Sequence, residues 1–313
     1  MVQAPRRGAL RAPHRGALRL ALAPPKPAWR PGLPRLITST ALLSLGMTLL
    51  GFAAWFMGGS QLHYFRVQHD AYANFRPELE QGAAPIGPLD PTDDKKLLAP
   101  GTPVAILSIP EVGLSAVVLE GTSGDVLEGG PGHLRDTPLP GQLGVSEILG
   151  RRAAYGGPFA RLLSLSPGAR FTVTTGQGVS RYKVLDIRRA GDRIPPFLPG
   201  QGRLILATAD GPPFAPTGVV RIDAQLVSKP QPAPPMVLSS ADIGPAEQAF
   251  GTEPIAWVPL VLWGQGLVVA ALGLSWARSL WSRWQAWIVA VPVLGYLGLE
   301  LADQVARLLP NLM

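Results

Sequence analysis

The sequence predicts a mainly β domain outside a membrane, with membrane-spanning helices before and after it. Two observations predict this class. Residues 101–229 contain short apolar runs separated by glycine- and proline-rich turns, a pattern typical of a barrel or a sandwich. Apolar runs without charge lie on both sides of that region, and the two longest have the length of a bilayer crossing.

The composition indicates a chain that is only partly soluble. Of the 313 residues, 47% are apolar and 16% are charged, whereas an average soluble domain has roughly 25% charged residues. The net charge is +7, but residues 1–35 alone carry eight Lys and Arg and no acid. The rest of the chain is close to neutral. Nucleic-acid binding, which requires a basic face on a folded domain, is therefore not predicted.

The N-terminal region is predicted to enter the membrane from the cytoplasm. Residues 1–35 are basic and proline-rich, which indicates a disordered cytoplasmic tail. Residues 36–58 are uncharged and mostly apolar, enough for a first transmembrane helix of about 30 Å. The cations before this helix place the tail inside, so we expect the chain to emerge outside the plasma membrane.

Residues 59–100 are predicted to form a juxtamembrane helix followed by a linker. Bulky side chains recur at spacings of three and four, which indicates one face of an amphipathic helix: Leu62, Phe65, His69, Tyr72 and Phe75. Pro77 is expected to end this helix or to start a new turn. The linker that follows is rich in proline, glycine and aspartate.

Seven strands and two short helices are predicted within 101–229 from the apolar runs and the turns between them. The helices are expected near 123–128, with Ser123 as N-cap, and near 158–165. The strands are Val104–Ile109, Ala116–Leu119, Ser146–Leu149, Phe171–Thr174, Arg181–Ile187, Arg203–Thr208 and Val219–Leu226.

After a second proline-rich linker at 230–254, the sequence predicts two more transmembrane helices, 255–276 and 285–301. Arg278 and Arg283 lie in the short loop between them and place that loop inside. The uncharged run of the last helix is short, and Glu300, Asp303 and Arg307 follow or end it. The predicted topology is inside–out–in–out, with the β domain extracytoplasmic.

A series of motifs in this order resembles the sortase family over about 130 residues. The pieces are Ile109-Pro110, GGPGH at 129–133, LPGQLG at 139–144, ILGRR at 148–152, YGGPFARLLSLSPGARFTV at 155–173, RYKVLDI at 181–187, LILATADG at 204–211 and VVRIDAQL at 219–226. The pattern looks most like the membrane-anchored actinobacterial sortases of class E or class C. Each piece is a weak signal alone, but their order and spacing are specific.

The resemblance implies a closed eight-stranded barrel and a cysteine transpeptidase. In that family a thiolate attacks a peptide carbonyl of a sorting signal, a histidine protonates the leaving amine, and an arginine stabilises the oxyanion. The acyl group then passes to an amine. The partners implied are exported peptides or cell-envelope proteins.

The residues that should carry this chemistry are absent. The family cysteine position holds Ala209, and the chain contains no cysteine at all, so no thiolate is available. The family histidine position holds Arg151, which stays protonated and cannot exchange a proton with a leaving group. The family arginine position falls near Val219, with Arg221 two residues further along the strand. The sequence therefore predicts a pseudo-sortase, with no catalytic residue of the family type.

The first functional hypothesis is a non-catalytic binding module with a polar groove. The predicted groove residues are Arg151, Arg152, Thr208, Asp210, Arg221 and His133. Arginines in such a groove would pair with peptide carboxylates. Asp210 is expected to face Arg151 or Arg152 across adjacent strands, where it could line the groove or form a structural ion pair. His133 is expected to satisfy backbone groups of its turn.

Two other functions stay open from the sequence. One is a transpeptidase or hydrolase with a hydroxyl nucleophile, Ser146 or Thr208, which would require a positioned base. The other is a multi-span membrane scaffold in which the helices matter more than the barrel. No cofactor or metal is predicted, because the linker acids Asp90, Asp93 and Asp94 cannot supply the six to eight oxygens that calcium takes.

Overall fold

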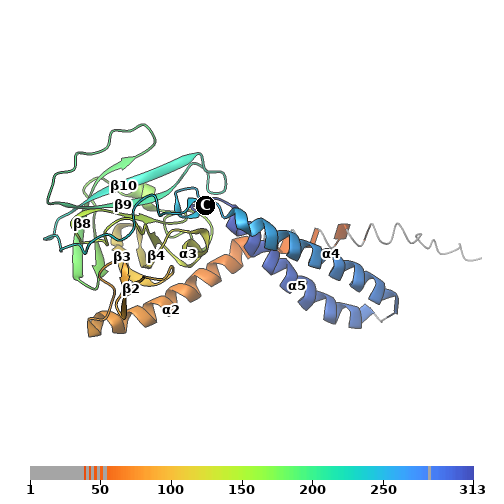
Figure 1. The fold of residues 1–313 in the computed structure, drawn as a ribbon. Coiled ribbons are helices and arrows are strands. Elements are labelled where there is room, and N and C mark those ends of the chain that lie inside the picture. The colour runs from red at the N-terminus through yellow and green to blue at the C-terminus, as the bar shows by residue number, and fades with distance from the viewer. Residues whose placement is uncertain (1–38, 40–41, 44–45, 48–49, 52–54, 281–282) are drawn as a thin grey trace, which may run out of the picture.

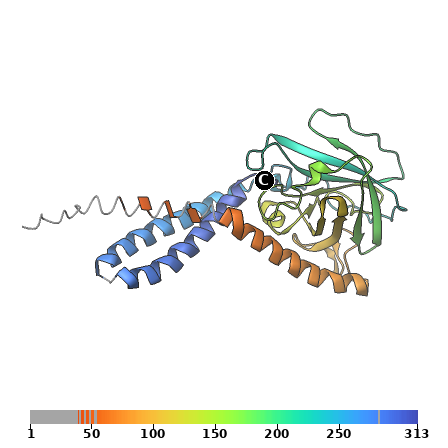
Figure 2. The same ribbon diagram turned by 180° about the vertical axis from the view of Figure 1, so that it is seen from behind.

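The computed structural model describes residues 55–280 and 283–313, together with 39, 42–43, 46–47 and 50–51. The predicted tail 1–35 lies outside the described residues, and so does most of the predicted first span 36–58. A β-barrel forms one end of the molecule, and a pair of long helices projects from it (Figure 1). A third helix, α2 (Ser60–Gln81), runs along the side of the barrel, as the opposite view also shows (Figure 2).

Eight strands close into a barrel in the order β10-β8-β7-β3-β4-β5-β6-β9, which confirms the predicted fold class. Neighbouring strands are antiparallel except for the parallel pairs β4–β5 and β6–β9. The strands are β3 (Pro103–Ile109), β4 (Leu114–Glu120), β5 (Gly132–His133), β6 (Gly144–Leu149), β7 (Arg170–Thr175), β8 (Gly178–Arg188), β9 (Gly202–Asp210) and β10 (Gly218–Leu226).

The barrel interior holds the main apolar core. Alternate residues of the strands point inward, as expected for a half-buried strand, and Leu107, Leu204 and Ile222 are fully buried there. Phe171 stacks on Tyr182 with ring centroids 5.4 Å apart. The Tyr182 hydroxyl accepts a hydrogen bond of 2.6 Å from the Gly141 backbone N–H, so its polar end is satisfied within the core.

The seven predicted strands are all present, each extended by one to three residues at one or both ends. The eighth strand, β5, has only two residues, one of them glycine, so it has no apolar pattern from which a strand could be predicted. The predicted linker 59–100 also contains a small hairpin, β1 (Leu89–Asp90) and β2 (Asp93–Leu97).

The predicted helix near 158–165 is wrong, because only a 3-10 turn forms there, η3 (Leu162–Ser164). Glycine and proline precede this segment and Ser166-Pro167 follows it, which leaves too few residues for a ladder of i to i−4 bonds. The other predicted short helix is present as α3 (Gly124–Gly129), with Ser123 at the N-cap position. The Ser123 hydroxyl bonds Asp125 rather than the backbone.

Helix α2 exists as predicted, but only one of the five residues of the predicted face, Phe75, is buried. Leu62 and Phe65 are 73% and 62% exposed, and Tyr64 and Ala71 are buried instead. The helix continues through Pro77 to Gln81, so the prediction that Pro77 ends it is wrong. Spacing therefore predicted the helix, but it could not show which of two apolar stripes meets the barrel.

Two helices, α4 (Trp257–Leu280) and α5 (Arg283–Leu308), form the projecting pair. Residues 254–274, which include most of α4, and residues 284–308 of α5 are long and apolar enough to cross a membrane. Only 6% and 11% of their most apolar stretches are buried inside the molecule. Such exposure of apolar side chains suggests membrane anchoring. The short turns η4 (Pro245–Glu247) and η5 (Pro254–Ala256) precede α4.

Gln68 joins α2 to the barrel through three hydrogen bonds. Its Nε2 donates to the carbonyls of Val117, at 3.0 Å, and Gly129, at 2.9 Å, and its Oε1 accepts from the Val117 N–H at 2.7 Å. The Gln68 side chain therefore bonds both the N–H and the carbonyl of Val117, as a residue of a neighbouring strand would. It joins the middle of α2 to β4 and to the end of α3.

We expect Gln68→Ala to destabilise the full chain by about 1–3 kcal/mol, because it leaves partly buried backbone groups of β4 without partners. Gln61→Ala, on an exposed position of the same helix, is the matched control and should be neutral. Thermal or denaturant unfolding in nanodiscs measures both. Equal stability of the two variants would contradict this role for Gln68.

Candidate functional site: the covered outer face of strands β6, β9 and β10

Two of the three positions that the family resemblance assigns to catalysis, those of Ala209 and Val219, lie side by side on the outer face of the barrel. Ala209 of β9 pairs directly with Val219 of β10. On the other side of β9, Leu149 of β6 lies beside Ala207 in a parallel register. Leu149, Ala207 and Ala209 form one buried apolar cluster, with Val219 packed against it. We call this surface the outer face. It carries apolar side chains at the position where the sortase resemblance implies a reactive cysteine.

The outer face is covered by segments from elsewhere in the chain. Leu312 belongs to the same buried cluster and has no exposed surface. Ala249 and Phe250, from the linker before α4, pack against the cluster from the side. Both views show the C-terminal end of the described chain at the junction of the barrel and the helical pair (Figures 1 and 2).

Residues 310–313, which we call the closing segment, are held on the outer face by backbone and side-chain hydrogen bonds. The Arg152 N–H donates to the Leu312 carbonyl at 3.1 Å, and the Asn311 N–H donates to the Gly251 carbonyl at 3.0 Å. The Asn311 Nδ2 is within 2.9–3.2 Å of the carbonyls of Thr122, Ala246 and Gln248. The closing segment thus bridges β6, the loop after β4 and the linker before α4.

Arg151, at the family histidine position, is fully buried rather than aimed into a groove. One of its terminal nitrogens donates to the Gly124 carbonyl at 2.8 Å and lies 3.7 Å from Glu128 Oε1. Its guanidinium carbon lies 4.8 Å from the centre of the Tyr155 ring, a cation–π distance. The remaining two guanidinium nitrogens, Nε and Nη1, have no hydrogen-bond partner.

Burial governs the electrostatics around Arg151. Desolvation lowers the pKa of the Arg151 guanidinium, and the nearby Glu128 carboxylate opposes that shift. Burial also raises the pKa of Glu128 to about 7, against the attraction of Arg151. Asp303 of α5 adds to the shift of Glu128. The residue at the family's proton-donor position therefore forms a charged contact between the barrel and α3, close to α5.

Arg152 and Thr208 serve the backbone near the family cysteine position. Arg152 Nη1 donates to the carbonyls of Ala209, at 3.1 Å, and Gly211, at 2.6 Å. The Thr208 hydroxyl is fully buried and donates to the Gly150 carbonyl at 2.8 Å. Both side chains stabilise the ends of β6 and β9, and the hydroxyl is not directed at solvent.

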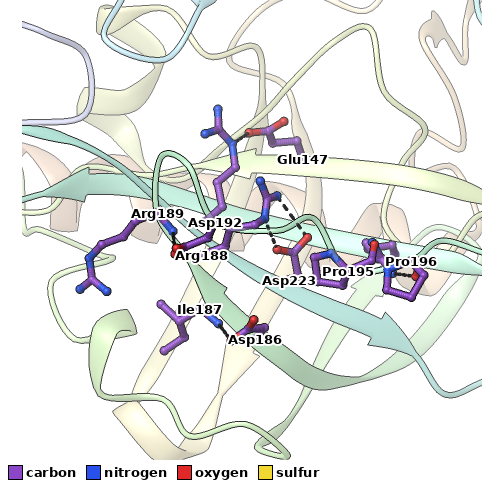
Figure 3. Close-up of polar contacts among 11 residues, drawn as sticks. Glu147, Asp186, Ile187, Arg188, Arg189, Asp192, Pro195, Pro196 and Asp223 are labelled. Carbon is purple, nitrogen blue, oxygen red and sulfur yellow. Dashed lines mark hydrogen bonds and ion pairs between the residues drawn. The ribbon is translucent and has the colours of Figure 1, made fainter.

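One aspartate on β9 and one on β10 form ion pairs with β8 and with the residue after it. Asp210 accepts from Arg189 Nε at 2.8 Å, and not from Arg151 or Arg152 as the strand order suggested. Asp223 accepts from Arg188 at 2.8 and 3.4 Å, and the two side chains point toward one another (Figure 3). Asp210 therefore has a structural partner, one of the two predicted possibilities.

Arg221 lines a cavity of about 170 Å³ beside the covered face. Its Nε lies 3.4 Å from Glu147 Oε1. Burial raises the pKa of Glu147, and the Arg221 guanidinium opposes that shift. Asp136 contributes a second carboxylate, and Leu134, Leu149, Ser240, Ile243, Gln248 and Ala249 complete the wall. This cavity holds both signs of charge and one partly exposed arginine.

His133 lies apart from this arrangement and is tied into its own turn. Its Nδ1 is 2.9 Å from Glu120 Oε2, and its Nε2 is 3.1 Å from the Pro138 carbonyl. Both the imidazole and the carboxylate are buried. Ser146 is buried as well, and its hydroxyl has no hydrogen-bond partner. Within the described ranges, no group of three or more His, Asp or Glu could hold a metal ion.

The structure thus brings Arg151, Arg152 and Thr208 to the margin of the outer face and places Arg221 at the cavity. Asp210 lies at the far end of β9, beside Arg189. The closing segment, whose Asn311 and Leu312 make the main contacts, was missed by the sequence reasoning. Four residues after a helix carry no periodicity, and only the apolar Leu312-Met313 pair after Pro310 hinted at burial.

Comparison with known proteins identifies the class. Residues 107–217 match the family model of the sortase domain. The match covers about a third of the chain and confirms the resemblance read from the motifs. Over these residues, which form most of the barrel, the chain is similar to the sortase domain.

Several solved structures are similar to the chain. The Clostridium perfringens sortase D5 transpeptidase is 19% identical, with a TM-score of 0.42 over 52% of this chain and 99% of that one. Sortase E from Streptomyces avermitilis is 28% identical, with a TM-score of 0.37 over 42% of this chain and 91% of that one. No curated protein matches the chain.

Glu128 is expected to make stability depend on pH. Its folded pKa of about 7 lies above the ordinary value of 4.5. The folded state therefore holds the proton more tightly, so this stabilisation is complete below about pH 4.5 and is lost as the pH rises through about 7. We expect the Tm of the full chain to fall between about pH 5 and 8.

Glu128→Gln should flatten that pH dependence and raise the Tm at the alkaline end, because a neutral amide needs no proton. Asp70→Asn, at an exposed position of α2, is the control and should leave the slope unchanged. Differential scanning calorimetry over the pH series measures both. A Glu128→Gln variant with the wild-type slope would contradict the assignment.

Proposed function

We propose that this chain is a membrane-anchored, extracytoplasmic sortase-like domain that does not catalyse transpeptidation and instead binds an exported peptide or an envelope protein. One observation carries the proposal: Ala209, Arg151 and Val219 stand where the family resemblance requires a nucleophile, a proton donor and an arginine. Ala209 has no lone pair to attack a carbonyl, and a buried arginine cannot protonate a leaving amine.

The helical pair supports the anchoring. The helices α4 and α5 expose apolar side chains such as Ile288 and Val269 over their length. Cationic Arg278, near the end of α4, and Arg283, at the start of α5, lie at the end of the pair away from the barrel. Positive residues favour the cytoplasmic side, so the opposite end of the pair, where the barrel is attached, lies outside. The charge of the tail 1–35 supports the same orientation.

The cavity beside the outer face supports binding. It is concave, partly apolar and contains Arg221, whose side chain is 34% exposed. Small-molecule and peptide sites commonly combine an apolar wall with a few placed polar groups. A carboxylate of a bound peptide would compete with Glu147 for the guanidinium.

The geometry does not favour a hydroxyl nucleophile. The Thr208 hydroxyl already donates to a carbonyl, and Ser146 is buried without a partner that could act as a base. An activated hydroxyl requires such a base within hydrogen-bond reach. The remaining alternative is a membrane scaffold in which the helices, not the barrel, bind the partners. Unchanged capture of envelope proteins after deletion of the barrel would favour that alternative.

Incubation of the full chain in nanodiscs with a sorting-signal peptide should give neither cleavage nor a covalent adduct. Ala209→Cys restores the thiol but should also fail, because Ala209 is 1% exposed and neither Arg151 nor Val219 can complete the reaction. Intact-protein mass spectrometry tests both chains. An acyl adduct on any atom of the wild-type chain would overturn the proposal.

A further inference from the structure

The closing segment lies on the outer face in the manner of a bound peptide. Asn311 is 1% exposed, and its Nδ2 faces three backbone carbonyls, those of Thr122 at 2.9 Å, Gln248 at 2.9 Å and Ala246 at 3.2 Å. Its Oδ1 has no partner. The contacts therefore select the donor half of the carboxamide, which an aspartate could not supply.

The next residue enters an apolar pocket. Leu312 has no exposed surface and packs with Leu127, Leu149, Ala207 and Ala209. Its carbonyl accepts from the Arg152 N–H at 3.1 Å. The outer face thus binds two consecutive side chains, a carboxamide and then an aliphatic group. It also forms hydrogen bonds with the backbone of this pair, at the Asn311 N–H and at the Leu312 carbonyl.

Part of the receptor for these two side chains is held by contacts that do not involve the closing segment. The turn that supplies two of the three carbonyls is fixed by an ion pair of 3.0 Å between Arg135 and Glu247. The barrel core contains no residue of the closing segment among the residues that the structure describes. A site that is ordered separately from its occupant can bind that occupant reversibly.

We propose that the outer face is a peptide-binding site for an extended segment with a carboxamide side chain followed by an aliphatic one, occupied within this chain by residues 310–313. A partner segment of the same chemistry would enter by displacing the closing segment. This inference rests on the proposed function, since it names the peptide that the non-catalytic domain binds and the contact that regulates access.

The absence of natural cysteine provides the probe. In full-length Ala209→Cys, reconstituted in nanodiscs, the single thiol lies beneath Leu312 and should react slowly with a maleimide. Adding Asn311→Asp places a carboxylate against three carbonyls and should raise the labelling rate by roughly tenfold or more. A chain ending at Leu309 is a second variant with the same expected increase.

Two matched Ala→Cys controls separate release of the closing segment from unfolding. Ala215→Cys, in the exposed loop between β9 and β10, should react fast in every background. Ala224→Cys, at a fully buried position of the barrel core, should stay slow when Asn311→Asp is added. Faster labelling of Ala224→Cys would show that the closing segment is part of the fold, and the inference would be wrong.

Peptides added in trans complete the test. A synthetic Pro-Asn-Leu-Met peptide with capped ends should slow labelling of Ala209→Cys in both released variants, and the Pro-Asp-Leu-Met peptide should not. Labelling that stays slow after Asn311→Asp and after truncation overturns the inference, as does fast labelling that the Asn peptide fails to slow. Neither result touches the absence of catalysis, which the adduct measurement tests separately.

Discussion

The outer face of β6, β9 and β10 is apolar, and the arrangement of the remaining chain follows from the need to keep it from water. A sortase-type face with Ala207, Ala209 and Val219 has no polar group to hydrate, so exposing it is unfavourable. The closing segment and the linker before α4 remove this surface from solvent. The same contacts bring the helical pair against the barrel, because the covering residues lie directly before α4 and after α5.

Burial also constrains Arg151, whose guanidinium lies inside the molecule with no exposed surface. A buried guanidinium is tolerated only with partners, and its partners come from α3 and the Tyr155 turn, with acids of α3 and the linker nearby. Two of its nitrogens nevertheless lack hydrogen bonds, and Glu128 Oε1, which lies 3.7 Å from Arg151, accepts no hydrogen bond. Arg151, at the position where the family has its proton-donating histidine, forms a fixed contact in which burial of the charge is energetically unfavourable.

Strand positions could be predicted from the sequence because barrel strands alternate and glycine or proline marks their ends, as for β9 and β10. The motif order also predicted the sortase fold, and it pointed to the altered Ala209 and Arg151. Contacts between distant segments could not be predicted. No local pattern reveals that Asn311 meets Thr122, or that Asp210 pairs with Arg189 and not with Arg152. In α2, apolar side chains lie on more than one face, and only the packing of Ala71 against β4 shows that Phe65 faces away from the barrel.

The chain passes between the barrel and the helical pair at two neighbouring places, before α4 and after α5. The Glu253 N–H bonds the Arg307 carbonyl at 3.1 Å, and the Asn311 N–H bonds the Gly251 carbonyl at 3.0 Å. A domain on a single stalk could swivel and sweep a wide volume, whereas two connections that are hydrogen-bonded to each other restrict the heights and tilts open to the barrel. With α4 and α5 in a bilayer, the outer face stays close to the lipid headgroups. Only stretches of another protein that run near its own point of membrane attachment would come within reach.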